Sequence, residues 1–264
     1  MIKQVLSIAG SDSGGGAGIQ ADLKAMSANG VYAMSVITAI TAQNTEEVAD
    51  VFELPTSIVA AQLDAIFDDF DVAAVKTGML SSAEIIRTVV KLLKPQQVKN
   101  LVVDPVMIAK GGQPLLKPDA IDTLTSTLFP LALLVTPNVH EAQQLSGIEI
   151  TSLADARRAA KIIHQFGCAH VLIKGGHLQQ DRGTDLLYDG RFFNIFKGEF
   201  IDTPHTHGTG CTFASAIAAH LARGKSVPDA VQTAKTYLTE AIRHNLAIGH
   251  GKGPTNHFYF LNQG

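Results

Sequence analysis

The sequence predicts an α/β protein with a central, mostly parallel sheet covered by helices on both faces. Short continuous apolar runs, such as residues 5–9 and 101–103, alternate with segments whose apolar residues recur at helical spacing. Strands that are apolar on both sides are typical of a parallel sheet between two helical layers. Asp189-Gly190 lies between two further apolar segments and predicts a tight hairpin, which would give the sheet an antiparallel edge.

The expected elements follow one another without a linker, a repeat or a low-complexity tract. Strands are predicted at residues 5–9, 34–40, 72–75, 101–103, 131–135 and 171–173, with hairpin strands at 187–188 and 191–195. Helices are predicted at residues 18–29, around 59–70, from Ser81 onward, and at 152–166, 211–222 and 228–245. Ser81 with Glu84 three residues later indicates a capping box. We therefore expect a single domain over residues 1–264.

Composition excludes several classes of protein. The 264 residues are 46% hydrophobic and 17% charged, which excludes a disordered chain. The net charge of -3 lacks the basic excess of a nucleic-acid-binding protein. The N-terminal apolar run is too short for a signal peptide, and no run approaches the ~20 residues that span a bilayer. Two widely spaced cysteines, Cys168 and Cys211, make no disulfide framework, so we expect a cytoplasmic protein with reduced thiols.

Polar and glycine-rich segments follow the predicted strands. In open α/β sheets, ligands bind beyond the carboxyl ends of the strands. The segments at these positions are residues 10–18, 41–44, 76–79, 104–113, 136–141, 174–177 and 205–211. We therefore expect the functional site at this edge of the sheet.

Residues 207–211, His-Gly-Thr-Gly-Cys, precede a predicted helix. The unpaired N–H groups and the positive dipole end of a helix start bind anions and would suit the phosphoryl group that a kinase transfers. The same dipole is expected to lower the pKa of Cys211. The alternative is a glycine-rich helix start with a small buried cysteine, and this segment alone does not decide between the two.

Residues 11–18 form a second glycine-rich run, for which a bound ligand is the expected source of order. The run fits the dinucleotide fingerprint loosely, but no acidic residue ends the second strand, which disfavours a Rossmann-type oxidoreductase. No Walker A motif occurs, so a P-loop fold is also disfavoured.

Several residues at the same edge have two interpretations each. Glu141 could hold Mg²⁺ near phosphates, while Asn138 and Glu141 also match a capping box, and the two roles are compatible. Lys174 could contact phosphate or be a solvated lysine before a glycine turn. Asp104 could bind metal or orient a base, and residues 110–113 could form a lid. His205 and His207 form a His-x-His pair for which no third metal ligand is spaced to match.

Together the motifs resemble the ribokinase-like superfamily, and more closely the hydroxymethylpyrimidine/phosphomethylpyrimidine kinases of thiamin biosynthesis. The matching segments run in family order over the whole chain at residues 9–22, 41–44, 76–79, 104–107, 136–138, 174–177, 207–211 and 249–254. The resemblance implies a three-layer α/β/α kinase that uses ATP and Mg²⁺. Such a kinase phosphorylates 4-amino-5-hydroxymethyl-2-methylpyrimidine and then its monophosphate. A homodimer is the expected assembly.

The resemblance also assigns roles to residues. Cys211 takes the position of the base, with Gly208, Thr209, Gly210 and Lys174 completing the catalytic set. Substrate-binding positions are Gln43, Gly10, Asp22, Met79 and Val106, nucleotide-binding positions are Lys174, Asn138, Thr209 and Lys235, and metal-binding positions are Glu141 and Asp104. Sugar kinases of the superfamily usually carry Asp at the Cys211 position, whereas the pyrimidine kinases and some pyridoxal kinases share the cysteine. A pyridoxal kinase of the same fold is therefore the alternative. A non-catalytic relative would be expected to lack Cys211 or Glu141, and both are present.

Overall fold

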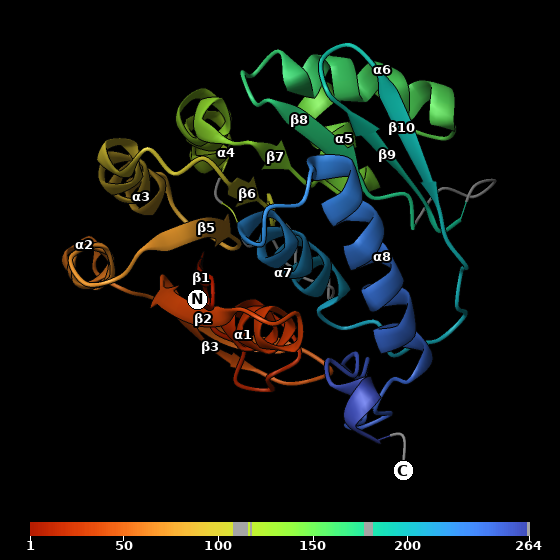
Figure 1. The fold of residues 1–264 in the computed structure, drawn as a ribbon, viewed down its shortest axis with the longest axis horizontal. Coiled ribbons are helices and arrows are strands. Elements are labelled where there is room, and N and C mark those ends of the chain that lie inside the picture. The colour runs from red at the N-terminus through yellow and green to blue at the C-terminus, as the bar shows by residue number, and fades with distance from the viewer. Residues whose placement is uncertain (108–115, 117, 177–181, 263–264) are drawn as a thin grey trace.

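The computed structural model describes residues 1–107, 116, 118–176 and 182–262. The predicted lid at 110–113 and His177 lie outside these residues. Eight described strands form one sheet in the order β10-β9-β8-β7-β6-β5-β1-β2 (Figure 1). The six strands β2, β1, β5, β6, β7 and β8 run parallel to one another. At the edge beyond β8, β9 pairs antiparallel with β8, and β10 pairs antiparallel with β9. The expected mostly parallel sheet with an antiparallel edge is confirmed.

Strands and helices alternate along the chain as the sequence predicts, with β4 and α4 as elements that were not predicted. The strands are β1 Gln4–Ala9, β2 Tyr32–Ile37, β3 Ala39–Gln43, β4 Val48–Glu53, β5 Val72–Thr77, β6 Leu101–Val103, β7 Leu134–Val135, β8 His170–Ile173, β9 Thr184–Tyr188 and β10 Phe193–Lys197. The helices are α1 Gly18–Ala28, α2 Thr56–Phe67, α3 Ala83–Gln96, α4 Pro118–Thr123, α5 Val139–Ser146, α6 Leu153–His164, α7 Thr209–Ala222 and α8 Val227–Arg243. None of the described helices combines the length and apolarity needed to cross a membrane.

Two apolar cores separate the sheet from its two helical layers. One contains buried residues of α2, α3, α4, α5 and α6, and the other contains buried residues of α1, α7 and α8. The strands supply alternate residues to the two cores, as in β1, where Leu6 packs in the first core and Val5 in the second. This alternation follows from the period of two along a strand. It confirms the three-layer arrangement.

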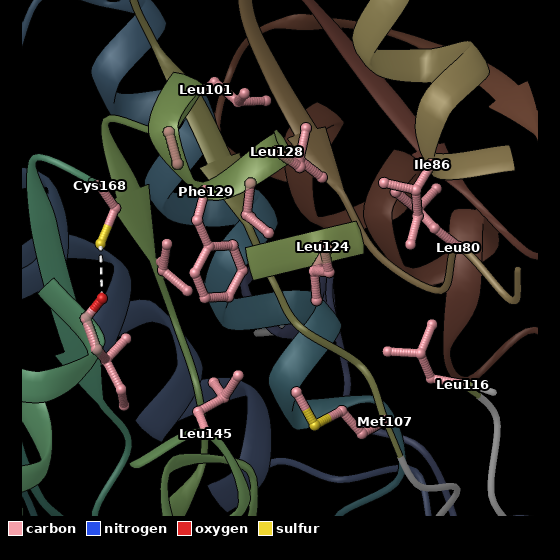
Figure 2. Packing of buried hydrophobic residues seen from close by; sticks show 14 of the residues in the cluster. Leu80, Ile86, Leu101, Met107, Leu116, Leu124, Leu128, Phe129, Leu145 and Cys168 are labelled. Carbon is pink, nitrogen blue, oxygen red and sulfur yellow. Dashed lines mark hydrogen bonds between the residues drawn. The ribbon is translucent and has the colours of Figure 1, made fainter. Parts of the chain in front are cut away.

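The core of the first layer includes Cys168. Figure 2 shows Phe129, Leu124 and Leu128 packed together, with the Cys168 Sγ donating to the Ile163 carbonyl oxygen at 3.8 Å. Burial raises the pKa of Cys168 to about 12, so the thiol stays protonated at neutral pH. Cys168 is therefore a free thiol of the apolar core.

Three local predictions are corrected. The strand predicted at 34–40 is split at Thr38, after which β3 leaves the main sheet and pairs with β4, a hairpin that the sequence analysis did not predict. The strand predicted at 131–135 is reduced to β7 because Leu131 ends a 3₁₀ turn. The cap of α3 is Ser82, whose side chain accepts from the Ile85 N–H, and not Ser81. The apolar residues of α3 keep the same helical spacing whichever serine caps the helix, so that spacing could not distinguish the two serines.

Candidate active site

Asp104 and Lys174 meet at the carboxyl edge of the sheet. Asp104 follows β6 and Lys174 follows β8, so the short β7 lies between them. The Lys174 Nζ lies 2.7 Å from the Asp104 Oδ1, and the Thr136 hydroxyl donates to the same oxygen at 3.2 Å. Burial alone would lower the pKa of Lys174, but the carboxylates of Asp104 and Glu141 outweigh it and raise that pKa above its ordinary value. The lysine is therefore held charged at the place predicted for phosphate binding.

Glu141 belongs to the same cluster through the start of α5. Asn138 accepts from the Glu141 N–H at 2.9 Å, and the Glu141 carboxylate accepts from the Asn138 N–H at 2.7 Å. The predicted capping box is confirmed. Burial raises the pKa of Glu141 to about 7, with Lys174 opposing and Asp104 adding to the shift. A bound cation would stabilise the charged form of a buried carboxyl group that lies beside one lysine and a second carboxylate. The metal-binding role of Glu141 therefore stays a prediction.

The start of α7 faces this cluster without a side-chain cap. Gly208 is the N-cap residue, and the first turn contains no acidic side chain. The N–H groups of Gly210 and Cys211 find no acceptor within the described part of the chain. A Cβ added at Gly210 would lie 3.4 Å from the Lys174 Nζ and 3.6 Å from the Asp104 Oδ2. Free N–H groups beside a lysine ammonium form an arrangement that can hold an anion.

Cys211 is partly exposed in the first turn of α7. Burial of the thiol group raises its pKa to about 11, helped by Asp22 and Asp104 and opposed by Lys76 and the Gly18 N–H. The expected lowering of this pKa is therefore wrong for the unliganded protein. Burial is the largest cause of the raised pKa, and the charges of Lys76, Asp22 and Asp104 act on the thiol in opposite directions.

The glycine-rich run after β1 is ordered by its own carboxylate. Asp12 is 1% exposed, and its carboxylate accepts from the N–H groups of Gly14, Gly16 and Ala17 at 2.8, 3.0 and 2.7 Å. The Asp12 Oδ2 also lies 2.8 Å from the His207 Nε2. The expectation that a bound ligand orders this loop is corrected, because the buried carboxylate already provides the acceptors.

Gln43 lies beside that loop, where its backbone N–H and carbonyl oxygen both bond the Ser13 hydroxyl. Its side chain is half-buried, and its Nε2 lies 3.4 Å from the His207 Nε2. The Thr41 hydroxyl donates weakly to its Oε1, at 3.3 Å. Because these contacts are long, the amide remains available to a bound molecule.

The other predicted substrate positions differ in exposure. Met79 packs on Gly10, where an added Cβ would lie 2.3 Å from the Met79 Cε, and Val106 is half-buried. The predicted substrate-binding role of Asp22 is corrected. Its side chain is fully buried, and both carboxylate oxygens accept from the Lys76 Nζ at 2.8 Å. It presents no free oxygen to a substrate.

Lys235, predicted to bind nucleotide, lies at the edge of this region. Its Nζ donates to the Asp185 Oδ2 at 2.5 Å and to the Gly183 carbonyl oxygen at 2.7 Å. Asp185 also accepts from the Gly175 N–H, which follows Lys174. The structure therefore links Lys235 to the loop after β8 through Asp185.

The sequence matches the family model for phosphomethylpyrimidine kinase over residues 12–256. The chain belongs to the phosphomethylpyrimidine kinase family. It is 50% identical to the hydroxymethylpyrimidine/phosphomethylpyrimidine kinase of Haemophilus influenzae over 264 residues, covering 98% of each chain. Membership in this family makes the chain a phosphotransferase.

Solved structures of related kinases share the fold. The phosphomethylpyrimidine kinase of Clostridium difficile is 49% identical, with a TM-score of 0.82 over 91% of this chain and 99% of that one. An ADP complex of the Bacillus subtilis pyridoxal kinase is 43% identical, with a TM-score of 0.92 over 99% of this chain and 100% of that one. The expected ribokinase-like fold is confirmed by these similarities, and a nucleotide complex within the group supports the use of ATP.

Two residues of this phosphomethylpyrimidine kinase family member had no role predicted from the sequence. The only signal for Asp12 was a carboxylate inside a glycine run. The signal for Lys76 was a lysine near the end of a strand that is otherwise apolar up to Thr77. The described residues contain no group of three or more His, Cys, Asp or Glu side chains placed to bind a metal. His205 and His207 contact different partners, Gly253 and Asp12.

Proposed function

We propose that this kinase transfers the terminal phosphoryl group of ATP to the hydroxymethyl group of 4-amino-5-hydroxymethyl-2-methylpyrimidine, and then to the resulting monophosphate. The observation that carries the proposal is the uncapped start of α7, where free N–H groups face the Lys174–Asp104 pair and Cys211 stands beside them. The names of the relatives supply the substrate class.

Each group at the site has a proposed task. The Gly208–Cys211 amides hold the migrating group, and Lys174 balances charge on its oxygens, because positioning and electrostatics dominate phosphoryl transfer. The Cys211 sulfur takes the proton of the substrate hydroxyl: the O–H bond breaks, an S–H bond forms, and the oxygen bonds to phosphorus as ADP leaves. The pKa of about 11 means that the thiolate form must be favoured by groups that arrive with the substrates.

Mg²⁺ fits the oxygen ligands available. Asp104 and Glu141 provide carboxylates that both act on Lys174, and Mg²⁺ is commonly held by one or two carboxylates together with phosphate oxygens and water. When bound, the ion would neutralise charge on the nucleotide phosphates. Thr209, Asn138 and Lys235 remain proposed nucleotide contacts. A homodimer and a cytoplasmic location also remain predictions, the first testable by light scattering and the second by fractionation of cells.

Gln43 is proposed to select the pyrimidine. The aminopyrimidine places an amino donor beside a ring-nitrogen acceptor, and a side-chain amide can pair with both at once. Pyridoxal has no such edge, although the structural similarity to a pyridoxal kinase keeps pyridoxal as the second candidate substrate. Coupled ADP-release assays with the two alcohols distinguish these functions. Turnover of pyridoxal but not of the pyrimidine would overturn the proposal.

Replacing Gln43 by Met keeps the length of the side chain and removes both hydrogen bonds. We expect a loss of about 1–3 kcal/mol in transition-state binding for the pyrimidine, measured as kcat/KM, because buried polar groups of the substrate are left unpaired. Turnover of pyridoxal should change much less. Equal losses for the two substrates, or none for the pyrimidine, would contradict the role of Gln43.

A further inference from the structure

A buried ion pair that has no role in the proposed reaction lies under the start of α7. The side chains of Lys76 on β5 and Asp22 on α1 are fully buried, and the Lys76 Nζ lies 2.8 Å from each carboxylate oxygen. The hydroxyls of Ser7 on β1 and Ser215 on α7 also donate to Asp22, at 2.6 and 2.7 Å. The pair is therefore fixed from four elements.

The pair is placed next to Cys211. Ser215 follows Cys211 by four residues on α7, so the two side chains share a helix face. A Cβ added at Gly78 would lie 2.9 Å from the Lys76 Nζ, which puts the ammonium directly beneath the backbone that follows β5. Both Asp22 carboxylate oxygens accept from the Lys76 ammonium, which has no other acceptor in the described part of the chain. Lys76 and Cys211 also interact electrostatically.

Stability alone does not account for this arrangement. Removing two charges from water is costly, and replacing a buried ion pair by apolar residues is often neutral or stabilising. A fixed charge in a low-dielectric environment acts strongly on its neighbours, however, and the partly exposed Cys211 is such a neighbour.

We propose that Lys76 is a positioning residue for phosphoryl transfer, whose fixed charge stabilises negative charge on the Cys211 sulfur, while Asp22 holds that charge in place and limits its effect. The proposal rests on the role of Cys211 as the base. Four charged groups act on Cys211: Lys76 from β5, Asp22 from α1, Asp104 after β6 and Lys174 after β8. The two lysines favour the thiolate, and the two carboxylates oppose it.

The test measures alkylation of Cys211 by iodoacetamide against pH, without substrate, in a Cys168→Ala background. Lys76→Met should raise the midpoint of the alkylation profile by about one pH unit or more. Asp22→Asn should lower it, because the opposing carboxylate is removed. If the pair only supports the fold, both substitutions loosen the same contacts and change the profile in the same direction, which would overturn the proposal. Arg243→Met, which removes the ion pairs with Glu199 and Glu240 away from the site, is the control and should leave the profile unchanged.

A lone Lys76→Met chain could fail to fold because Asp22 is left without a partner. The double variant Asp22→Asn/Lys76→Met removes both charges and should fold. Its midpoint should rise by less than that of Lys76→Met, since the Lys76 effect on Cys211 exceeds the Asp22 effect. Its kcat for the pyrimidine should fall with KM nearly unchanged. A folded double variant with the wild-type alkylation profile would overturn the proposal. Because alkylation needs no substrate, this result is independent of which alcohol the kinase phosphorylates.

Discussion

The two glycine-rich loops, residues 10–18 and 207–211, precede the helices α1 and α7 but use their glycines differently. In the first loop, Asp12 accepts from three backbone N–H groups and closes the loop on itself. In the second, no side chain caps α7, and the N–H groups of Gly210 and Cys211 stay open towards Lys174 and Asp104. The loops are also packed on each other, since a Cβ at Gly208 would lie 1.7 Å from the Gly16 carbonyl oxygen. A glycine run is therefore a binding loop only where its N–H groups have no internal acceptor.

The largest effect on kcat is expected in the second loop, residues 207–211. Cys211→Ala should lower kcat by roughly 10²- to 10⁴-fold, the usual contribution of a general base, while ATP binding stays nearly intact. Steady-state kinetics together with nucleotide titration measures both quantities. A kcat close to the wild-type value would exclude Cys211 as the base.

Substitutions at two glycines of the same loop distinguish a packing role from a binding role. Gly208 has a φ of 75° and no room for a Cβ, so Gly208→Ala should lower the free energy of unfolding by about 3 kcal/mol or more. Gly210→Ala meets only ordinary van der Waals contacts, so stability should change by less than about 1 kcal/mol, the cost of an added side chain at a tolerant site. Its methyl group would nevertheless enter the anion position, so we expect a larger loss of kcat than of stability. Urea unfolding and kinetics of both variants provide the comparison, and equal stability of the two would contradict the packing role of Gly208.

The stability that Asp12 gives to the first loop, residues 10–18, should be lost in acid. Burial alone would raise the pKa of Asp12, but the hydrogen bonds from His207, Ala17 and Gly14 outweigh it and hold that pKa below its ordinary value. A carboxylate with a lowered folded-state pKa contributes stability above its unfolded pKa and loses it as the pH falls through the folded value. Asp12→Ala should cost about 3 kcal/mol at pH 7, as for a broken buried pair, and the difference from wild type should shrink below about pH 4. Urea unfolding at several pH values tests this. A constant difference from pH 7 to pH 3 would show that Asp12 acts by packing alone.

The smallest change in stability is expected at Glu141. Glu141→Gln keeps an acceptor for the Asn138 N–H and removes the charge, so the melting temperature should change little. If the carboxylate helps to hold Mg²⁺, the Mg²⁺ concentration needed for half-maximal activity should rise. An unchanged Mg²⁺ titration would leave Glu141 with its capping role only.

Local features of the sequence determined most of the fold and the place of the site. The alternation of apolar strands with helical segments depends on residues within one or two turns of each other, and so does the Asn138–Glu141 capping box. The polar clusters after the strands lie at one edge because parallel strands end on the same side of a sheet. The sequence alone therefore predicted that one site contains residues 208–211, Lys174, Asp104 and Glu141. The structure places these residues near one another.

Only the tertiary structure decided which charges act on which groups. Asp12 meets His207 across 195 residues of sequence, and Lys76 meets Asp22 across 54, so no local pattern could pair them. The pKa of Cys211 likewise is raised chiefly by burial and is modified by charges from other elements, neither of which the helix start visible in the sequence could indicate. Short-range periodicity fixes strands, helices and their order, whereas electrostatics depends on distances and burial that arise only when distant segments pack together.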